Sequence, residues 1–364
     1  MQTEVVRIIE SALNGQSSKV REYCQLLIQN LKKEGDGKFA ERLERTLKMN
    51  LRENQPIASL DEIANLAPKD VESKLSMLEV ENPKVVKKLI LDDNIEESIS
   101  GFIKRVRARD QLSSLGIDPK LSLLLYGPPG CGKTTIANYI AKETNLPIVT
   151  ARLDTIVSSL LGSTSKNIRK VFEYTNNKPC ILFLDEFDAI AKARDNEFEH
   201  GELKRVINSL LQSIDQYSNV LIAATNHSEI LDNAVWRRFS TIIEVTKPTS
   251  KEFIGELMDS ILNEYNIIIE SEKIKGVVIE NFMNLSPSDI RSILLNTISN
   301  MVINGESKLS YLTLLSEIFK AKNHGKVDKM KLIEFLNHNT ISQISISEWT
   351  GLSLRKIKEI LSKK

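Results

Sequence analysis

The sequence predicts an α/β protein built on a doubly wound parallel sheet of five strands, with helical units before and after it. From about residue 91 to residue 248, short apolar runs alternate with stretches of helical periodicity, as in parallel strands joined by crossover helices. A glycine-rich turn separates the first apolar run from a helical stretch. Before residue 53 and after residue 248, the periodicity is helical only.

The chain of 364 residues is long for one domain, and its composition changes along its length. Turn signals at 14–15 and 35–37 divide the first 52 residues into three helices, which either pack on the rest or dock a partner. The predicted segments are an N-terminal helical domain (1–52), a linker (53–90), an α/β domain (91–248), a helical lid (249–322) and a C-terminal helical unit (323–364).

Composition excludes several classes of protein. The formal charge is +1, so any attraction to nucleic acid must be local. Cys24, Cys131 and Cys180 are far apart and odd in number, which argues against a disulfide framework. The first residues lack the apolar stretch of a signal peptide, and no run approaches about 18 apolar residues. We expect a cytoplasmic protein with no membrane partner.

The five strand candidates are short apolar runs rich in β-branched residues and leucine, each followed by a turn or a polar residue. They lie at residues 121–126, 147–151, 180–185, 220–225 and 241–245.

The glycine-rich turn reads GPPGCGKT and lies between the first strand and a helix, which is the setting of a phosphate-binding loop. Backbone N–H groups and the helix dipole would bind phosphates, Lys133 would reach the β- and γ-phosphates, and the Thr134 hydroxyl would ligate Mg²⁺. The pattern predicts a P-loop NTPase fold that binds a nucleoside triphosphate. The residues assigned to the nucleotide are Gly127, Pro128, Pro129, Gly130, Cys131, Gly132, Lys133, Thr134 and Thr135.

A second cluster follows the strand at 180–185, about fifty residues after Lys133. Asp185 at the end of this strand can hold Mg²⁺ through its water shell, and Glu186 can orient and activate an attacking water. The plainer interpretation is that both acids cap a strand at the surface.

Polar residues also follow the next strand. Asn226 could hold the attacking water or the γ-phosphate. Arg237 and Arg238 stand between Trp236 and Phe239, and guanidinium groups there could stabilise transition-state charge on a neighbouring subunit's γ-phosphate. Surface solvation is the other interpretation of the two arginines.

In this order, the motifs resemble those of the AAA+ ATPases, closest to the AAA clade, over residues 90–310. The resemblance assigns 127–134 to Walker A, 181–186 to Walker B, Asn226 to sensor 1, and Arg237 and Arg238 to arginine fingers. It implies Mg²⁺-dependent ATP hydrolysis in a homo-oligomer, usually a hexameric ring, in which each subunit's arginines complete the next site. Ser286–Arg291 is similar to the start of the lid motif, where Arg291 is a candidate second sensor.

Two positions depart from the pattern or allow a second role. Leu160 stands where the family's polypeptide-gripping loop carries an aromatic residue, so it either grips a substrate or packs. Cys131 lies at a helix N-terminus, which predicts a lowered thiol pKa, although this position accepts many residues in the family.

Several segments look closer to one group of bacterial ATPases, those encoded beside a subtilisin-like serine protease in phage-defence and plasmid-exclusion modules. This resemblance implies a protease partner in trans, since no nucleophile–His–Asp set is evident in the chain. It rests on residues 182–192, 199–205, 223–227 and 234–239.

The last forty residues predict a helix-turn-helix. Residues 346–350 and 354–361 have helical character, and the turn between them contains Gly351. Arg355, Lys356 and Lys358 suit phosphates and base edges, so residues 326–364 are a candidate DNA-binding unit. Protein docking and plain packing are the other interpretations. The sequence therefore favours an oligomeric ATPase that remodels a macromolecule, with an ATP-switched DNA-binding regulator as the alternative.

Overall fold

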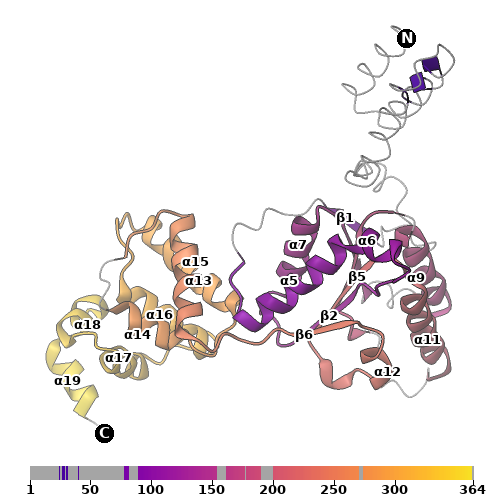
Figure 1. Ribbon diagram of the computed structural model, residues 1–364. Helices are drawn as coiled ribbons and strands as arrows, with labels where there is room; N and C mark the ends of the chain where they lie inside the picture. Colours follow the sequence, from indigo (N-terminus) through magenta and orange to yellow (C-terminus); the bar gives the residue numbers. More distant parts are fainter. Residues whose placement is uncertain are drawn as a thin grey trace.

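The computed structural model describes residues 78–81, 89–153, 161–176, 178–189, 200–269 and 274–362 (Figure 1). It also describes a few positions before residue 41, which are helical and include a small buried cluster of Leu27, Ile28, Leu31 and Ala40. The other residues of the predicted N-terminal domain, and most of the predicted linker, lie outside the described residues.

A six-stranded sheet forms the centre of the α/β domain, in the order β1-β3-β4-β5-β2-β6. The five predicted strands are present, and the described pairings among them are all parallel. The sixth, β1, was not expected; it pairs antiparallel with β3 at the edge of the sheet, Leu78 opposite Ala151. The strands are β1 (Leu78–Glu81), β2 (Ser122–Tyr126), β3 (Ile148–Arg152), β4 (Ile181–Asp185), β5 (Val220–Thr225) and β6 (Thr241–Glu244).

Helices cover both faces of the sheet, which is why its central strands are apolar on both sides. Along β2, Leu123 and Leu125 belong to one buried cluster and Leu124 to the other, as the two-residue period of a strand requires. One face carries α5 (Asp93–Arg107) and α7 (Lys133–Thr144), with the short α6 (Arg109–Ser114) after α5; the other carries α9 (Leu161–Asn176), α11 (His200–Gln216) and α12 (Asn233–Trp236).

The described residues after β6 form seven further helices, which group beside the sheet (Figure 1). The predicted lid and the predicted C-terminal unit share one hydrophobic core, which runs from Ile254 to Ile357. The helices are α13 (Lys251–Glu264), α14 (Lys275–Phe282), α15 (Pro287–Ile303), α16 (Tyr311–Lys322), α17 (Lys329–His338), α18 (Gln343–Thr350) and α19 (Leu354–Ser362). In the part of the chain that the structure describes, no helix is long and apolar enough to cross a membrane.

Candidate functional site

The glycine loop lies between β2 and α7, as the sequence predicts. Gly127 has a φ of 139°, and a β-carbon there would lie 2.3 Å from the carbonyl oxygen of Val245, so no other residue fits without a backbone shift. Gly130 has a φ of 75°, and its β-carbon would lie 2.7 Å from the Ser286 hydroxyl oxygen. Gly127 is therefore required by close approach to the backbone as well as by its conformation, and Gly130 is favoured by its left-handed conformation and by the serine side chains beside it.

Lys133 opens α7 and is 7% exposed. Its ammonium donates to the carbonyl oxygens of Gly127 at 2.7 Å and Pro128 at 2.9 Å. Burial lowers the pKa of Lys133, and the nearby charges of Asp185 and Asp188 only partly offset that effect. A partly desolvated cation inside a loop of backbone N–H groups is a suitable binding partner for phosphate oxygens.

The acids after β4 lie at the same edge of the sheet, because β4, β5 and β2 are adjacent and parallel. Asp185 and Glu186 are both half-buried, and Asp185 Oδ1 accepts a hydrogen bond from the backbone N–H of Glu186 at 2.9 Å. Glu186 has a φ of 53°, in the left-handed region that non-glycine residues seldom adopt. Strain of this kind gathers at functional sites, which fits a carboxylate held for catalysis.

The available donors fit Mg²⁺ bound with a nucleotide. Thr134 and Thr135 are exposed in the first turn of α7, and the Asp185 carboxylate lies near Lys133. Among the described residues, no group of three His, Cys, Asp or Glu side chains could hold a metal alone. Magnesium usually keeps several waters and takes one or two protein oxygens plus substrate phosphates, which is the set available here.

One site residue was missed by the sequence reasoning. Asp188 is 4% exposed, and its Oδ1 accepts from the Thr225 hydroxyl at 3.1 Å and from the Asn226 N–H at 3.4 Å. It therefore ties the segment after β4 to the segment that carries Asn226. The signal in the sequence was a third acid, three residues after Asp185.

The lid reaches the loop through the start of α15. Ser286 and Asp289 form a reciprocal capping box, and the Ser288 N–H donates to the Gly130 carbonyl at 3.1 Å. Arg291, the candidate second sensor, pairs with Glu264 on α13, with both terminal nitrogens 3.3 Å from Oε2. The guanidinium of Arg291 is thus held within the lid in this structure.

Arg237 and Arg238 are not gathered with these residues. The Arg238 carbonyl accepts from the hydroxyl of Ser122, the first residue of β2, at 3.1 Å, whereas the glycine loop follows the last residue of that strand. The separation along β2 is about 13 Å, at about 3.3 Å per residue. The Arg238 backbone therefore lies toward the opposite end of β2 from the loop of its own chain.

The prediction that the pKa of the Cys131 thiol is lowered is wrong. Burial raises the pKa of the Cys131 thiol, and the charges of Lys133 and Lys247 lower it by less. The position at a helix N-terminus is real, but desolvation of the thiolate outweighs it. Leu160 and the rest of segment 154–160 lie outside the described residues, as do Lys363 and Lys364.

Comparison with known proteins finds relatives of the region around this site. The model of the family described as "ATPase family associated with various cellular activities (AAA)" matches residues 123–247. An uncharacterized AAA family ATPase of Sinorhizobium fredii is 47% identical over 150 residues, which is 41% of this chain and 46% of that protein.

Two further relatives carry more specific names. A proteasome-activating nucleotidase of Methanococcus maripaludis is 32% identical over 244 residues, covering 62% of this chain and 56% of the relative. A peroxisomal ATPase of Dictyostelium discoideum is 30% identical over 229 residues, covering 58% and 19%. The chain thus spans about half the length, or less, of these relatives.

Proposed function

We infer, from the match of residues 123–247 to the model of the AAA ATPase family, that this protein hydrolyses ATP with Mg²⁺ and acts as an oligomer that remodels a macromolecule. The observation that carries the inference is the edge of the sheet where the glycine loop, Asp185, Glu186 and Asn226 meet.

Each residue at this edge has a separate task. Lys133 and the loop N–H groups would bind the phosphates, while Thr134 and Asp185 would hold the metal directly or through water. Bound Mg²⁺ would supply charge that offsets the negative charge developing on the γ-phosphate. Glu186 accepts the proton of the attacking water, and Asn226 fixes that water or the γ-phosphate.

Assembly is proposed because a complete site needs arginines that the same chain does not bring to its own loop. A neighbouring subunit would supply them in a ring, and the rings of the family that this chain resembles usually have six subunits. Charge spread over three phosphate oxygens in the transition state is what a guanidinium stabilises.

The ATPase rate measured against protein concentration tests both parts of this proposal. We expect turnover per subunit to rise steeply with concentration, and Glu186→Gln to bind ATP while hydrolysing it at least about a hundredfold more slowly. Glu229→Gln is a matched control, because Glu229 is exposed and pairs only with His227 among the described residues. Turnover that is constant while the protein stays monomeric would contradict the shared site.

The proposed output is remodelling of a protein, delivered to a serine protease in trans. One relative is named for activating the proteasome, and segments of this chain resemble ATPases encoded beside a subtilisin-like protease. The test is to purify this protein with the product of any adjacent protease gene and measure ATP-dependent cleavage of a folded reporter. Cleavage that requires ATP and is lost in Glu186→Gln would support it, and ATP-independent cleavage would contradict it.

DNA binding is the second candidate, favoured by the geometry of the tail. α18 and α19 are joined by a short turn in which Gly351 has a φ of 69°, and the Ser347 hydroxyl donates to the Leu352 carbonyl at 2.6 Å. Arg355, Lys356 and Lys358 are exposed on α19. This is the arrangement of a helix-turn-helix with a basic second helix.

Duplex DNA binding measured over a range of salt concentrations tests this candidate. Affinity should fall steeply with salt, and the triple substitution Arg355→Ala, Lys356→Ala and Lys358→Ala should weaken it and flatten the salt dependence. The double substitution Lys251→Ala and Lys275→Ala on the lid is the control. Equal binding by the wild type and the triple variant would contradict it.

A further inference from the structure

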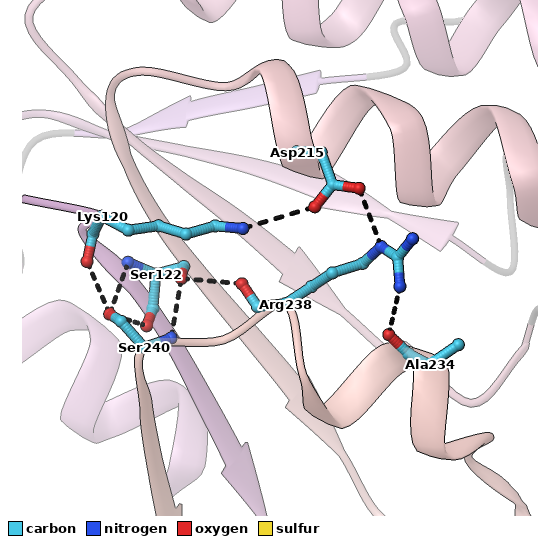
Figure 2. Close-up of polar contacts among 6 residues, drawn as sticks. All are labelled: Lys120, Ser122, Asp215, Ala234, Arg238 and Ser240. Atoms are coloured by element: carbon cyan, nitrogen blue, oxygen red, sulfur yellow. Dashed lines mark hydrogen bonds and ion pairs between the residues drawn. The ribbon is translucent and has the colours of Figure 1, made fainter.

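Arg237 and Arg238 are adjacent in sequence but have different surroundings. Arg238 is half-buried; its Nε donates to Asp215 Oδ2 at 3.1 Å, and a terminal nitrogen donates to the Ala234 carbonyl (Figure 2). Arg237 is exposed, and within the described part of the chain its guanidinium makes no hydrogen bond or ion pair. One guanidinium is thus occupied within its own subunit and the other is available.

Asp215 connects three segments. It lies in the last turn of α11 and also accepts from the Lys120 ammonium at 3.4 Å, just before β2 (Figure 2). At 45% exposure the Asp215 carboxylate is partly screened by water. Arg238, which is 27% exposed, is held both by this carboxylate and by the Ala234 carbonyl.

The backbone of the same segment is fixed as well. The Ser122 hydroxyl donates to the Arg238 carbonyl at 3.1 Å, the Ser240 N–H donates to the Ser122 hydroxyl oxygen at 3.0 Å, and the Ser240 hydroxyl donates to the Lys120 carbonyl at 2.6 Å (Figure 2). On the other side of the arginines, the Trp236 ring packs edge-on against Tyr126, with centroids 5.1 Å apart. Trp236 therefore packs at the last residue of β2, and the segment of Arg238 and Ser240 is bonded at the first residue of that strand.

We propose that Arg237 alone acts on the neighbouring subunit's ATP, and that Arg238 is a positioning residue held by Asp215. This rests on the proposed ATPase function and differs from the equal roles that the sequence resemblance implies. To contact a neighbouring subunit, Arg238 would have to lose its ion pair with Asp215 and its hydrogen bond to the Ala234 carbonyl. Arg237 is already exposed to solvent.

The test uses the full chain, assembled at high concentration, in the variants Arg237→Ala, Arg238→Ala, Asp215→Ala and the double Asp215→Ala/Arg238→Ala. Turnover number, KM for ATP and unfolding temperature are measured for each. Arg107→Ala is the matched control, since Arg107 is also an ion-paired surface arginine but pairs with Glu143 on the other face of the sheet.

Arg237→Ala should lower turnover at least about a hundredfold with little change in KM or unfolding temperature. Mixing Arg237→Ala with Glu186→Gln should restore turnover. In a mixed assembly, a Glu186→Gln subunit supplies its intact Arg237 to the site of an Arg237→Ala neighbour, which keeps Glu186. Asp215→Ala and Arg238→Ala should each lower turnover about tenfold with KM unchanged, and the double variant should be no worse. Arg238→Lys, which keeps a charge for Asp215, should recover part of the loss.

Other outcomes overturn the assignment. If Asp215→Ala leaves turnover unchanged while Arg238→Ala abolishes it, Arg238 itself is the residue that reaches the phosphate. If wild type hydrolyses ATP and Arg237→Ala does so equally well, the role of Arg237 is wrong while the ATPase stands. A wild-type chain without turnover at any concentration overturns the ATPase proposal and this one with it.

Discussion

The carboxylate of Asp188, after β4, accepts a hydrogen bond from the hydroxyl of Thr225, the last residue of β5, at 3.1 Å. The same Asp188 oxygen accepts from the Asn226 N–H at 3.4 Å, and the Thr225 oxygen accepts from the His227 N–H at 3.1 Å. The position of the proposed sensor asparagine is thus set by an acid on the neighbouring strand's loop, two residues after Glu186.

We therefore expect Asp188→Ala to slow ATP turnover at least about tenfold while KM for ATP changes little. The variant leaves buried donors without an acceptor, at about 1–3 kcal/mol for each. Asp188→Asn keeps a carbonyl oxygen at the same place and should retain more activity. The measurement is steady-state kinetics together with urea unfolding, and equal turnover in Asp188→Ala and wild type would remove this residue from the site.

Gly127 gives a prediction about nucleotide binding. In Gly127→Ala, the new β-carbon would meet the Val245 carbonyl oxygen at 2.3 Å, so the loop must move away from β6. We expect loss of ATP binding and destabilisation by roughly 1–3 kcal/mol or more from backbone strain. Calorimetric titration with ATP and thermal unfolding measure both.

Gly101→Ala is the matched control for that substitution. Gly101 lies inside α5, and a methyl group added there would meet no atom within 4 Å apart from its chain neighbours and the adjacent backbone of its own helix. Replacing it should stabilise the protein by about 0.5–1 kcal/mol and leave ATP binding intact. If both alanine variants bind ATP equally, the close approach of Gly127 to Val245 does not limit the loop.

The buried ammonium of Lys133 predicts a pH-dependent stability. Because its pKa is lowered in the folded chain, the unfolded chain holds this proton more tightly, so stability rises with pH between the lowered pKa and the ordinary lysine value. At a pH below the lowered pKa, the full cost of burying the charge is present. Lys133→Met should therefore unfold at a temperature no lower than wild type at pH 7, with its advantage shrinking at alkaline pH.

Thermal unfolding from pH 7 to pH 10, with and without ATP, measures this effect. ATP should raise the unfolding temperature of wild type and leave that of Lys133→Met unchanged. Lys251→Met, at an exposed lysine on α13, controls for loss of a surface charge. A large destabilisation of Lys133→Met at pH 7 would show that the bonds to the Gly127 and Pro128 carbonyls outweigh burial.

The parts of the site that could be predicted are those encoded locally. The loop at 127–134 carries its own strand, turn and helix signals, and the carboxyl ends of parallel strands meet at one edge, which brings Asp185 and Asn226 toward Lys133. The strand β1 was missed because its two-residue alternation lasts only four residues, Leu78 to Glu81, inside a polar, proline-containing segment.

The contacts of the site that could not be predicted depend on which segments become neighbours in the fold. Asp188 meets Thr225 only because β4 and β5 are adjacent, and Asp215 meets Arg238 across 23 positions of sequence. Neither pairing leaves a periodic signal in the chain. The pKa of Cys131 was misjudged for the same reason, since its burial arises from packing among α7 and the sheet rather than from its position in the loop.

The three thiols provide a prediction that tests this packing directly. Cys24 is half-exposed, Cys131 is buried, and burial raises the pKa of the fully buried Cys180 to about 12. Because the thiolate is the reactive form, alkylation of the native protein at pH 7.5 should modify Cys24 first and Cys180 last. Peptide mass spectrometry over time measures the order.

Cys131→Ala should keep near wild-type ATP turnover, since a small apolar residue fills the same buried position. Rapid alkylation of Cys131 with loss of ATPase activity would instead show that its thiolate is favoured in the loop, as the helix N-terminus alone would predict.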